Sequence, residues 1–221
     1  MTKIKICGIT NLDDALLAVE AGADYLGFIF YPPSKRAIVP ETCRTIVAAL
    51  RDRADCPLLV GVFVDESAAH MVQILSDCRL DLAQLSGDEV PSLVADDKSP
   101  IYGRSYKALR PPSLVVAEAE AEWYIPPERE PDHPALLIDT YHQSLRGGTG
   151  ETGDWAMSAQ LARSIPGLML AGGLNATNVA AAVRQVRPFA VDVASGVERA
   201  PGKKDHAAVR QFIHNARNPK L

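Results

Sequence analysis

Continuous apolar runs rich in β-branched residues alternate with helical patterns along the whole chain. The runs are unbroken rather than alternating apolar and polar, which is typical of strands buried on both faces. Strands are predicted near residues 3–7, 24–30, 58–64, 81–85, 101–108, 134–139, 168–171 and 189–193. Helices are predicted at residues 11–21, 40–53, 67–78, 88–96, 154–164, 175–187 and 205–216.

The alternation of strands and helices predicts a parallel sheet. Eight such units in 221 residues leave about 28 residues for each strand, helix and pair of loops. We therefore expect the α/β class and one single-domain (β/α)8 barrel that spans residues 1–221. An open doubly wound sheet is the alternative that periodicity alone leaves open. Two absences in the sequence count against it: no Gly-x-Gly-x-x-Gly motif follows the first strand, and no change in composition divides the chain.

The least regular stretch runs from Glu118 to Pro134 and carries four prolines. Proline interrupts both helix interiors and central strands. We expect this stretch to be an exposed connection between a short fifth helix and the sixth strand.

Composition narrows the function classes. The net charge of −4 argues against nucleic acid as the main partner, because phosphate backbones need a concentrated basic surface. No apolar run is long enough for a signal peptide or a membrane span, so a cytoplasmic protein without a membrane partner is expected. The four cysteines include no Cys-x-x-Cys pair, which argues against zinc.

Active sites of (β/α)8 barrels lie at the C-terminal ends of the strands. Cys7, Asp139 and Asp192 each fall at such an end. A lone cysteine on a strand is more often a packing residue than a reactive one. Asp139 closes an apolar run, where an unpaired carboxylate would be costly to bury, but it could instead cap a helix or anchor a loop. Asp192 could bond its own loop backbone.

Three glycine-containing loops follow the last three predicted strands. In barrels the loops after strands seven and eight commonly bind phosphate through backbone N–H groups. A phosphorylated small molecule is therefore the expected ligand. The candidate phosphate-binding residues are Gly148, Gly172, Gly173, Ala194, Ser195 and Gly196.

Two further residues are candidates for substrate binding. Arg36 follows the second strand in a loop stiffened by prolines, and its planar guanidinium suits a carboxylate partner. Gln84, at the end of the fourth strand, is a secondary candidate. His142 lies near the expected mouth of the barrel without an assigned role.

These motifs, in this order and over essentially the whole chain, resemble the phosphoribosylanthranilate isomerase family of tryptophan biosynthesis. The stretches that carry the resemblance are Lys5-Ile6-Cys7-Gly8-Ile9-Thr10, Leu26-Gly27-Phe28-Ile29-Phe30, Ser34-Lys35-Arg36, Val60-Gly61-Val62-Phe63-Val64, Gln84-Leu85-x-Gly87-Asp88-Glu89, Leu137-Ile138-Asp139-Thr140, Gly147-Gly148-Thr149-Gly150, Asp154-Trp155, Leu170-Ala171-Gly172-Gly173-Leu174, Val191-Asp192-Val193-x-Ser195-Gly196-Val197-Glu198 and Pro201-Gly202-x-Lys204-Asp205.

The resemblance implies an aldose–ketose isomerase that converts N-(5-phosphoribosyl)anthranilate to 1-(2-carboxyphenylamino)-1-deoxyribulose 5-phosphate by an Amadori rearrangement, with no metal or organic cofactor. It implies Asp139 as the general acid, Cys7 as the general base, Arg36 as the carboxylate ligand and Asp192 as a substrate-hydroxyl or loop-orienting residue. For these roles, burial should raise the pKa of Asp139 and nearby positive charge should lower the pKa of Cys7.

The chain departs from the family pattern at four positions, Lys35, Ser86, Gly153 and Ala194, which bear on the ligand pocket rather than on the proposed acid and base. Two other functions stay open at this point. One is an isomerase that performs the same rearrangement on a histidine-pathway intermediate, expected to use two aspartates and half-barrel repeats. The other is a non-catalytic phosphate-binding barrel. We expect a monomer, with a homodimer as the alternative.

Overall fold

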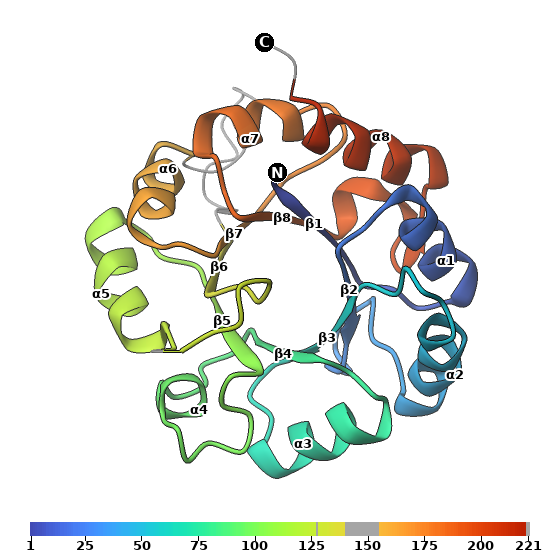
Figure 1. Ribbon diagram of the computed structural model, residues 1–221, viewed down its shortest axis with the longest axis horizontal. Helices are drawn as coiled ribbons and strands as arrows, with labels where there is room; N and C mark the ends of the chain where they lie inside the picture. The colour runs from blue at the N-terminus through green and yellow to red at the C-terminus, as the bar shows by residue number, and fades with distance from the viewer. Residues whose placement is uncertain (127, 140–154, 220–221) are drawn as a thin grey trace.

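The eight strands of the sheet lie in parallel and in chain order, and the eighth pairs with the first (Figure 1). The computed structural model describes residues 1–126, 128–139 and 155–219. Helices surround the strands on the outside of the closed barrel. The predicted (β/α)8 barrel is therefore confirmed, and the open doubly wound sheet is wrong.

The barrel strands are β1 (Lys3–Cys7), β2 (Tyr25–Ile29), β3 (Leu58–Phe63), β4 (Leu82–Leu85), β5 (Ser105–Leu109), β6 (Leu136–Asp139), β7 (Leu168–Ala171) and β8 (Ala190–Val193). The helices are α1 (Leu12–Ala21), α2 (Pro40–Arg51), α3 (Ala68–Asp77), α4 (Ser92–Ala95), α5 (Leu114–Tyr124), α6 (Trp155–Ser164), α7 (Val179–Val186) and α8 (His206–Arg217). A short 3₁₀ turn (Ser195–Val197) and a small hairpin of β9 (Glu198–Ala200) and β10 (Lys203–Lys204) stand between β8 and α8.

Two apolar layers hold the barrel together. The outer layer packs strand residues such as Ile4, Ile6 and Phe28 against the surrounding helices. The inner layer fills part of the barrel interior with residues that include Tyr25, Tyr106 and Met169. Burial of apolar surface on both faces explains why the strands read as continuous apolar runs in the sequence.

The predicted elements differ from the observed ones where a local signal was weak. The fifth strand was predicted from residue 101 but begins at Ser105, and the fourth helix shrinks to four residues. The stretch from Glu118 to Tyr124 is helical, contrary to its assignment to the exposed connection. Every proline of that stretch lies after Tyr124, and its Ala-Glu composition favours helix.

The connection between α5 and β6 does more than link two elements. Its residues 128–132 are mostly exposed, as expected. In Figure 1 this segment lies inside the ring of strands. The backbone carbonyl of Asp132 accepts hydrogen bonds from the Tyr25 hydroxyl at 2.5 Å and from Lys3 Nζ at 3.3 Å. The connection therefore packs across the N-terminal end of the barrel.

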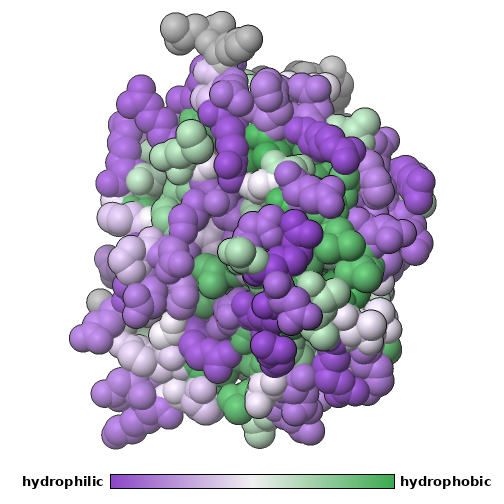
Figure 2. All heavy atoms as spheres, turned by 45° about the vertical axis from the view of Figure 1, so that its right-hand side comes forward, coloured by the Kyte–Doolittle hydropathy of each residue, from purple (hydrophilic) through white to green (hydrophobic). Residues whose placement is uncertain are grey.

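The surface over α1, α2 and their neighbours carries mainly hydrophilic residues, with hydrophobic residues visible between them (Figure 2). Among the described residues, no helix has the length and apolar character that a membrane crossing requires.

Candidate active site

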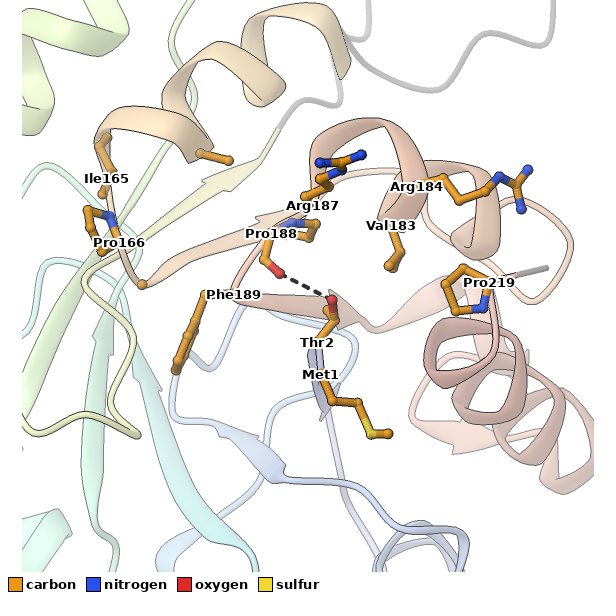
Figure 3. A pocket seen from close by; sticks show the side chains of 12 residues that line it. Met1, Thr2, Ile165, Pro166, Val183, Arg184, Arg187, Pro188, Phe189 and Pro219 are labelled. Atoms are coloured by element: carbon orange, nitrogen blue, oxygen red, sulfur yellow. Dashed lines mark hydrogen bonds between the residues drawn. The ribbon is translucent and has the colours of Figure 1, made fainter. Parts of the chain in front are cut away.

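A cavity of about 800 Å³ lies at the end of the barrel opposite the predicted site (Figure 3). Its walls include Thr2, Gly167 and Phe189, which precede β1, β7 and β8 respectively. The Thr2 hydroxyl donates to the Pro188 carbonyl there at 3.2 Å. Since barrel chemistry occurs at the C-terminal ends of the strands, this cavity is not the candidate active site.

A second cavity, of about 330 Å³, opens at the C-terminal ends of β6, β7 and β8. It brings together the predicted acid and most of the predicted phosphate-binding residues. The cavity is lined by Asp139, Ala171, Gly172, Gly173, Leu174, Asp192, Val193, Ala194, Ser195 and Gly196. A carboxylic acid thus lies beside two glycine-containing loops, as the sequence predicted.

The two loops present backbone donors to this cavity. Gly172 and Gly173 have positive φ angles of 98° and 65°, which glycine adopts without strain. Among the described residues, no acceptor takes a hydrogen bond from the backbone N–H of Gly173, Ser195 or Gly196. A Cβ at Gly196 would lie 1.9 Å from the Leu174 carbonyl oxygen, so only glycine allows the two loops to approach this closely. Such an arrangement of N–H groups suits an anion.

Cys7 ends β1 with a nearly buried side chain. A Cβ at Gly27 would lie 2.7 Å from the Cys7 sulfur, so the glycine of the neighbouring strand makes room for the thiol. The expected lowering of its pKa is wrong. Burial raises the pKa of Cys7, and the positive charges of Lys5 and Lys204 oppose that rise without overcoming it.

Lys5 is one of the residues near the site that sequence reasoning missed. Its side chain is fully buried, and its Nζ donates to Asp192 Oδ1 at 2.9 Å and to Gln84 Oε1 at 2.8 Å. The signal was present in Lys3-Ile4-Lys5-Ile6-Cys7, where alternation places the polar residues on one face of the strand.

Gln84 is tied into the same group. Its Oε1 also accepts from the Tyr106 hydroxyl at 3.0 Å, and its Nε2 donates to Ser86 Oγ at 3.1 Å. The serine at this departure from the family pattern therefore orients Gln84. The structure places Gln84 against Lys5 rather than against the cavity around Asp139.

Arg36 lies over the tip of β1 and makes a bidentate ion pair with Glu198, with Nη2 2.8 Å from Oε2 and Nε 2.9 Å from Oε1. Lys204 joins this pair from β10. Its buried Nζ donates to the carbonyls of Cys7 at 2.6 Å and Ala194 at 3.0 Å, and to Glu198 Oε1 at 3.1 Å. The hairpin that carries Glu198 and Lys204 was not predicted, and it fixes the ends of β1 and β8.

Asp139 ends β6 with a side chain that is 26 % exposed, and Arg110 Nε lies 3.3 Å from its Oδ2. A third cavity, of about 430 Å³, borders Arg110 on the side of β4 and β5. Three residues of the sequence predictions, Gly148, His142 and Gly153, lie outside the described residues. Within the described part of the chain, no three His, Cys, Asp or Glu side chains gather as metal ligands would.

Comparison with known proteins identifies the family. The model of the N-(5'-phosphoribosyl)anthranilate isomerase family matches residues 4–215. The chain belongs to this family. The N-(5'-phosphoribosyl)anthranilate isomerase of Trichlorobacter lovleyi is 45 % identical over 217 residues, with 98 % of each chain covered. That of Pseudomonas fluorescens is 44 % identical over 96 % of this chain and 97 % of its own.

Solved structures agree with this membership. The phosphoribosylanthranilate isomerase of Thermotoga maritima superposes with a TM-score of 0.83 and 40 % identity, covering 99 % of this chain and all of its own. Another solved isomerase of the family, in complex with reduced 1-(o-carboxyphenylamino)-1-deoxyribulose 5-phosphate, has a TM-score of 0.81 and 38 % identity over 99 % of this chain and 100 % of its own. The expected family is thus confirmed.

Glu198 provides a test of the charge cluster behind the site. Its burial opposes ionisation, but hydrogen bonds and charge from Arg36 and Lys204 outweigh burial and hold its pKa below the ordinary value. A carboxyl with a lowered folded-state pKa stabilises the protein above its unfolded-state pKa, and this contribution disappears as pH falls through the folded-state value.

We expect Glu198→Gln to lower the free energy of unfolding at pH 7 by about 3 kcal/mol, because two cations lose a buried partner. The difference in the free energy of unfolding between the variant and the parent should disappear as the pH falls below 4. Urea unfolding at several pH values measures this difference. Glu41→Gln, which removes the 71 % exposed partner of Arg44, is the control and should change stability by less than about 1 kcal/mol. A gap that stays constant from pH 7 to pH 3 would contradict this account.

Proposed function

We propose that this chain is the isomerase that converts N-(5'-phosphoribosyl)anthranilate to 1-(2-carboxyphenylamino)-1-deoxyribulose 5-phosphate in tryptophan biosynthesis, with Asp139 as the general acid and Cys7 as the general base. Family membership supports the reaction. The single observation that supports the site is the shared cavity of Asp139 and the loops after β7 and β8, which Asp192 connects through Lys5 to Cys7.

The acid step requires a proton at the ring oxygen of the ribose. The Asp139 carboxyl donates it while the bond from the ring oxygen to C1' breaks, and the nitrogen lone pair forms a Schiff base with C1'. Asp139 leaves this step as a carboxylate. Its position on the cavity wall, with a partly exposed side chain, gives a bound sugar access to it.

The base step removes the proton from C2'. The Cys7 thiolate takes this proton and becomes the neutral thiol, while the electron pair of the C–H bond forms the double bond between C1' and C2'. The Schiff-base nitrogen receives the displaced electrons, and the resulting enolamine becomes the ketone. One donor and one acceptor on different atoms of the sugar are what this rearrangement needs.

Two anchors would hold the substrate. Backbone N–H groups of Gly173, Ser195 and Gly196 line the cavity and suit the phosphate. Arg36 uses one edge of its guanidinium on Glu198, through Nε and Nη2. A guanidinium carries five N–H donors, so the remaining three can bind the anthranilate carboxylate.

The proposal extends to localisation, partners and oligomeric state. We propose a cytoplasmic protein whose partner is a small phosphorylated molecule rather than nucleic acid or a membrane, and we propose a monomer. A Thermotoga maritima relative is described as a dimeric protein from which monomers were generated, so the oligomeric state of this chain needs its own measurement by light scattering.

Replacement of either proposed catalytic residue should remove most of the turnover. Cys7→Ala and Asp139→Asn should each lower kcat by about 10²–10⁴-fold, because each removes one proton-transfer group. Steady-state assays with the anthranilate substrate, alongside circular dichroism to verify the fold, measure this. Near-parental kcat in a folded variant would overturn the assignment of that residue. If the parent protein instead turned over the carboxamide substrate of the histidine pathway, the proposed substrate would be wrong.

Arg36→Ala should raise KM more than it lowers kcat, because a carboxylate anchor binds the ground state and the transition state alike. The assay is repeated with a substrate analogue that lacks the carboxylate, on which parent and variant should then perform alike. An unchanged KM, or an equal loss of rate on both substrates, would show that Arg36 has another role.

Inorganic phosphate should bind weakly at the loops after β7 and β8 and compete with the substrate. Gly196→Ala should raise the inhibition constant for phosphate, because the new Cβ would meet the Leu174 carbonyl at 1.9 Å and push the loops apart. Ser195→Ala is the matched control in the same turn, since it keeps the backbone N–H and should leave the constant nearly unchanged. Non-competitive inhibition by phosphate would contradict the assignment.

A further inference from the structure

The buried lysine of β1 has a role that the proposed acid and base do not account for. Burial of an ammonium is costly unless it is paired and hydrogen-bonded. Lys5 is fully buried in the barrel interior, and Asp192 and Gln84 hold two of its three N–H donors at 2.9 and 2.8 Å. The fixed position of the side chain leaves the third donor for a neighbour on the same face of the strand.

That neighbour is Cys7. Residues two apart on a strand point to the same side, and Lys5 and Cys7 both border the space above Gly27. A Cβ at Gly27 would lie 2.7 Å from the Cys7 sulfur and 3.2 Å from Lys5 Cε. The positive charge of Lys5 acts on the thiol and favours its ionised form.

The charges around Cys7 do not cancel. The titratable and charged groups that act on the thiol come from four strands and the loop after β2: Lys5, Arg36, Tyr106, Asp192 and Lys204. Glu198 pairs with both Arg36 and Lys204.

Lys204 donates to three acceptors at once, which requires its ammonium form. The cluster therefore holds three cations, Lys5, Arg36 and Lys204, against two carboxylates. A thiolate at Cys7 would supply the missing negative charge.

We propose that Lys5 is a positioning residue for the isomerisation, whose ammonium is fixed by Asp192 and Gln84 so that it donates to the Cys7 sulfur and stabilises the thiolate. The inference rests on the proposed function of Cys7. Lys5 keeps its proton throughout. The thiol loses its proton to water before the substrate reacts, and the thiolate then takes the C2' proton and becomes the thiol again.

This role is compatible with the raised pKa of Cys7. Burial is the largest influence and disfavours the charged form, while Lys5 is the largest influence in the opposite direction. Asp192 works against the thiolate both by its own charge and by neutralising Lys5. The structure therefore predicts opposite effects when the two partners of this ion pair are removed separately.

The test measures the thiol directly. The rate of alkylation of Cys7 by iodoacetamide is followed against pH and read by mass spectrometry on the peptide that contains Cys7, so that the other three cysteines do not interfere. Lys5→Met should raise the pH at which the alkylation rate is half-maximal, the midpoint, by about one pH unit or more. Asp192→Asn should lower this midpoint. Lys5→Met should also lower kcat at pH 7 about tenfold or more, with a smaller effect on KM.

Lys3→Met is the matched control. Lys3 lies on the same face of β1 but at the other end of the barrel, where its Nζ donates to the Asp132 carbonyl. Both the midpoint and the kcat should stay at the parental values in this variant. Circular dichroism and thermal unfolding verify that each variant is folded.

An unchanged midpoint in folded Lys5→Met overturns the proposal and leaves Lys5 a structural residue. If Lys5→Met does not fold, Asp192→Asn decides, because an unchanged or raised midpoint there overturns the proposal equally. If the parent protein lacks isomerase activity but Lys5→Met still shifts the midpoint of Cys7 alkylation, the proposed reaction is overturned. The coupling of Lys5 to Cys7 is supported in that case.

Discussion

The geometry of the site depends on the hydrogen bonds of the Lys204 ammonium. A single buried Nζ joins the carbonyl of Cys7, the carbonyl of Ala194 and the carboxylate of Glu198. These acceptors belong to β1, to the loop after β8 and to β9, which are distant in the sequence. Because all three donors of the ammonium are used, the position of the thiol relative to the phosphate-type loop is fixed by one residue.

The same set of contacts includes Arg36, the proposed carboxylate anchor. Glu198 also forms an ion pair with Arg36, whose side chain packs against the tip of β1 at Gly8. A β-carbon at Gly8 would lie 2.9 Å from Arg36 Cδ, and the φ angle of 75° at this position also favours glycine. The proposed carboxylate anchor and the proposed base are therefore held by one connected set of charges.

The barrel and the edge that carries the candidate site were predictable because they follow from repetition. Eight apolar runs with intervening helices predict a parallel sheet and favour a barrel, and that fold brings Asp139, Asp192 and the loops after β7 and β8 to one edge. The β9–β10 hairpin and the buried lysines were not predictable in this way. Lys5 and Lys204 are polar residues in apolar surroundings, and only the three-dimensional arrangement shows which carboxylates and carbonyls compensate their burial.

The error about Cys7 has a physical lesson. Sequence reasoning counted the charges that would favour a thiolate but could not weigh the burial that opposes it, since burial depends on Gly27 and on the packing around the strand end. In the folded protein burial prevails, and the pKa of Cys7 is raised. If Cys7 is the base, as proposed, its thiolate needs positive charge that is not already neutralised, and Arg36 and Lys204 share the one carboxylate of Glu198. A substrate carboxylate bound to Arg36 would add negative charge near Cys7, which would make the fixed ammonium of Lys5 the more important counter-charge in the proposed proton transfer.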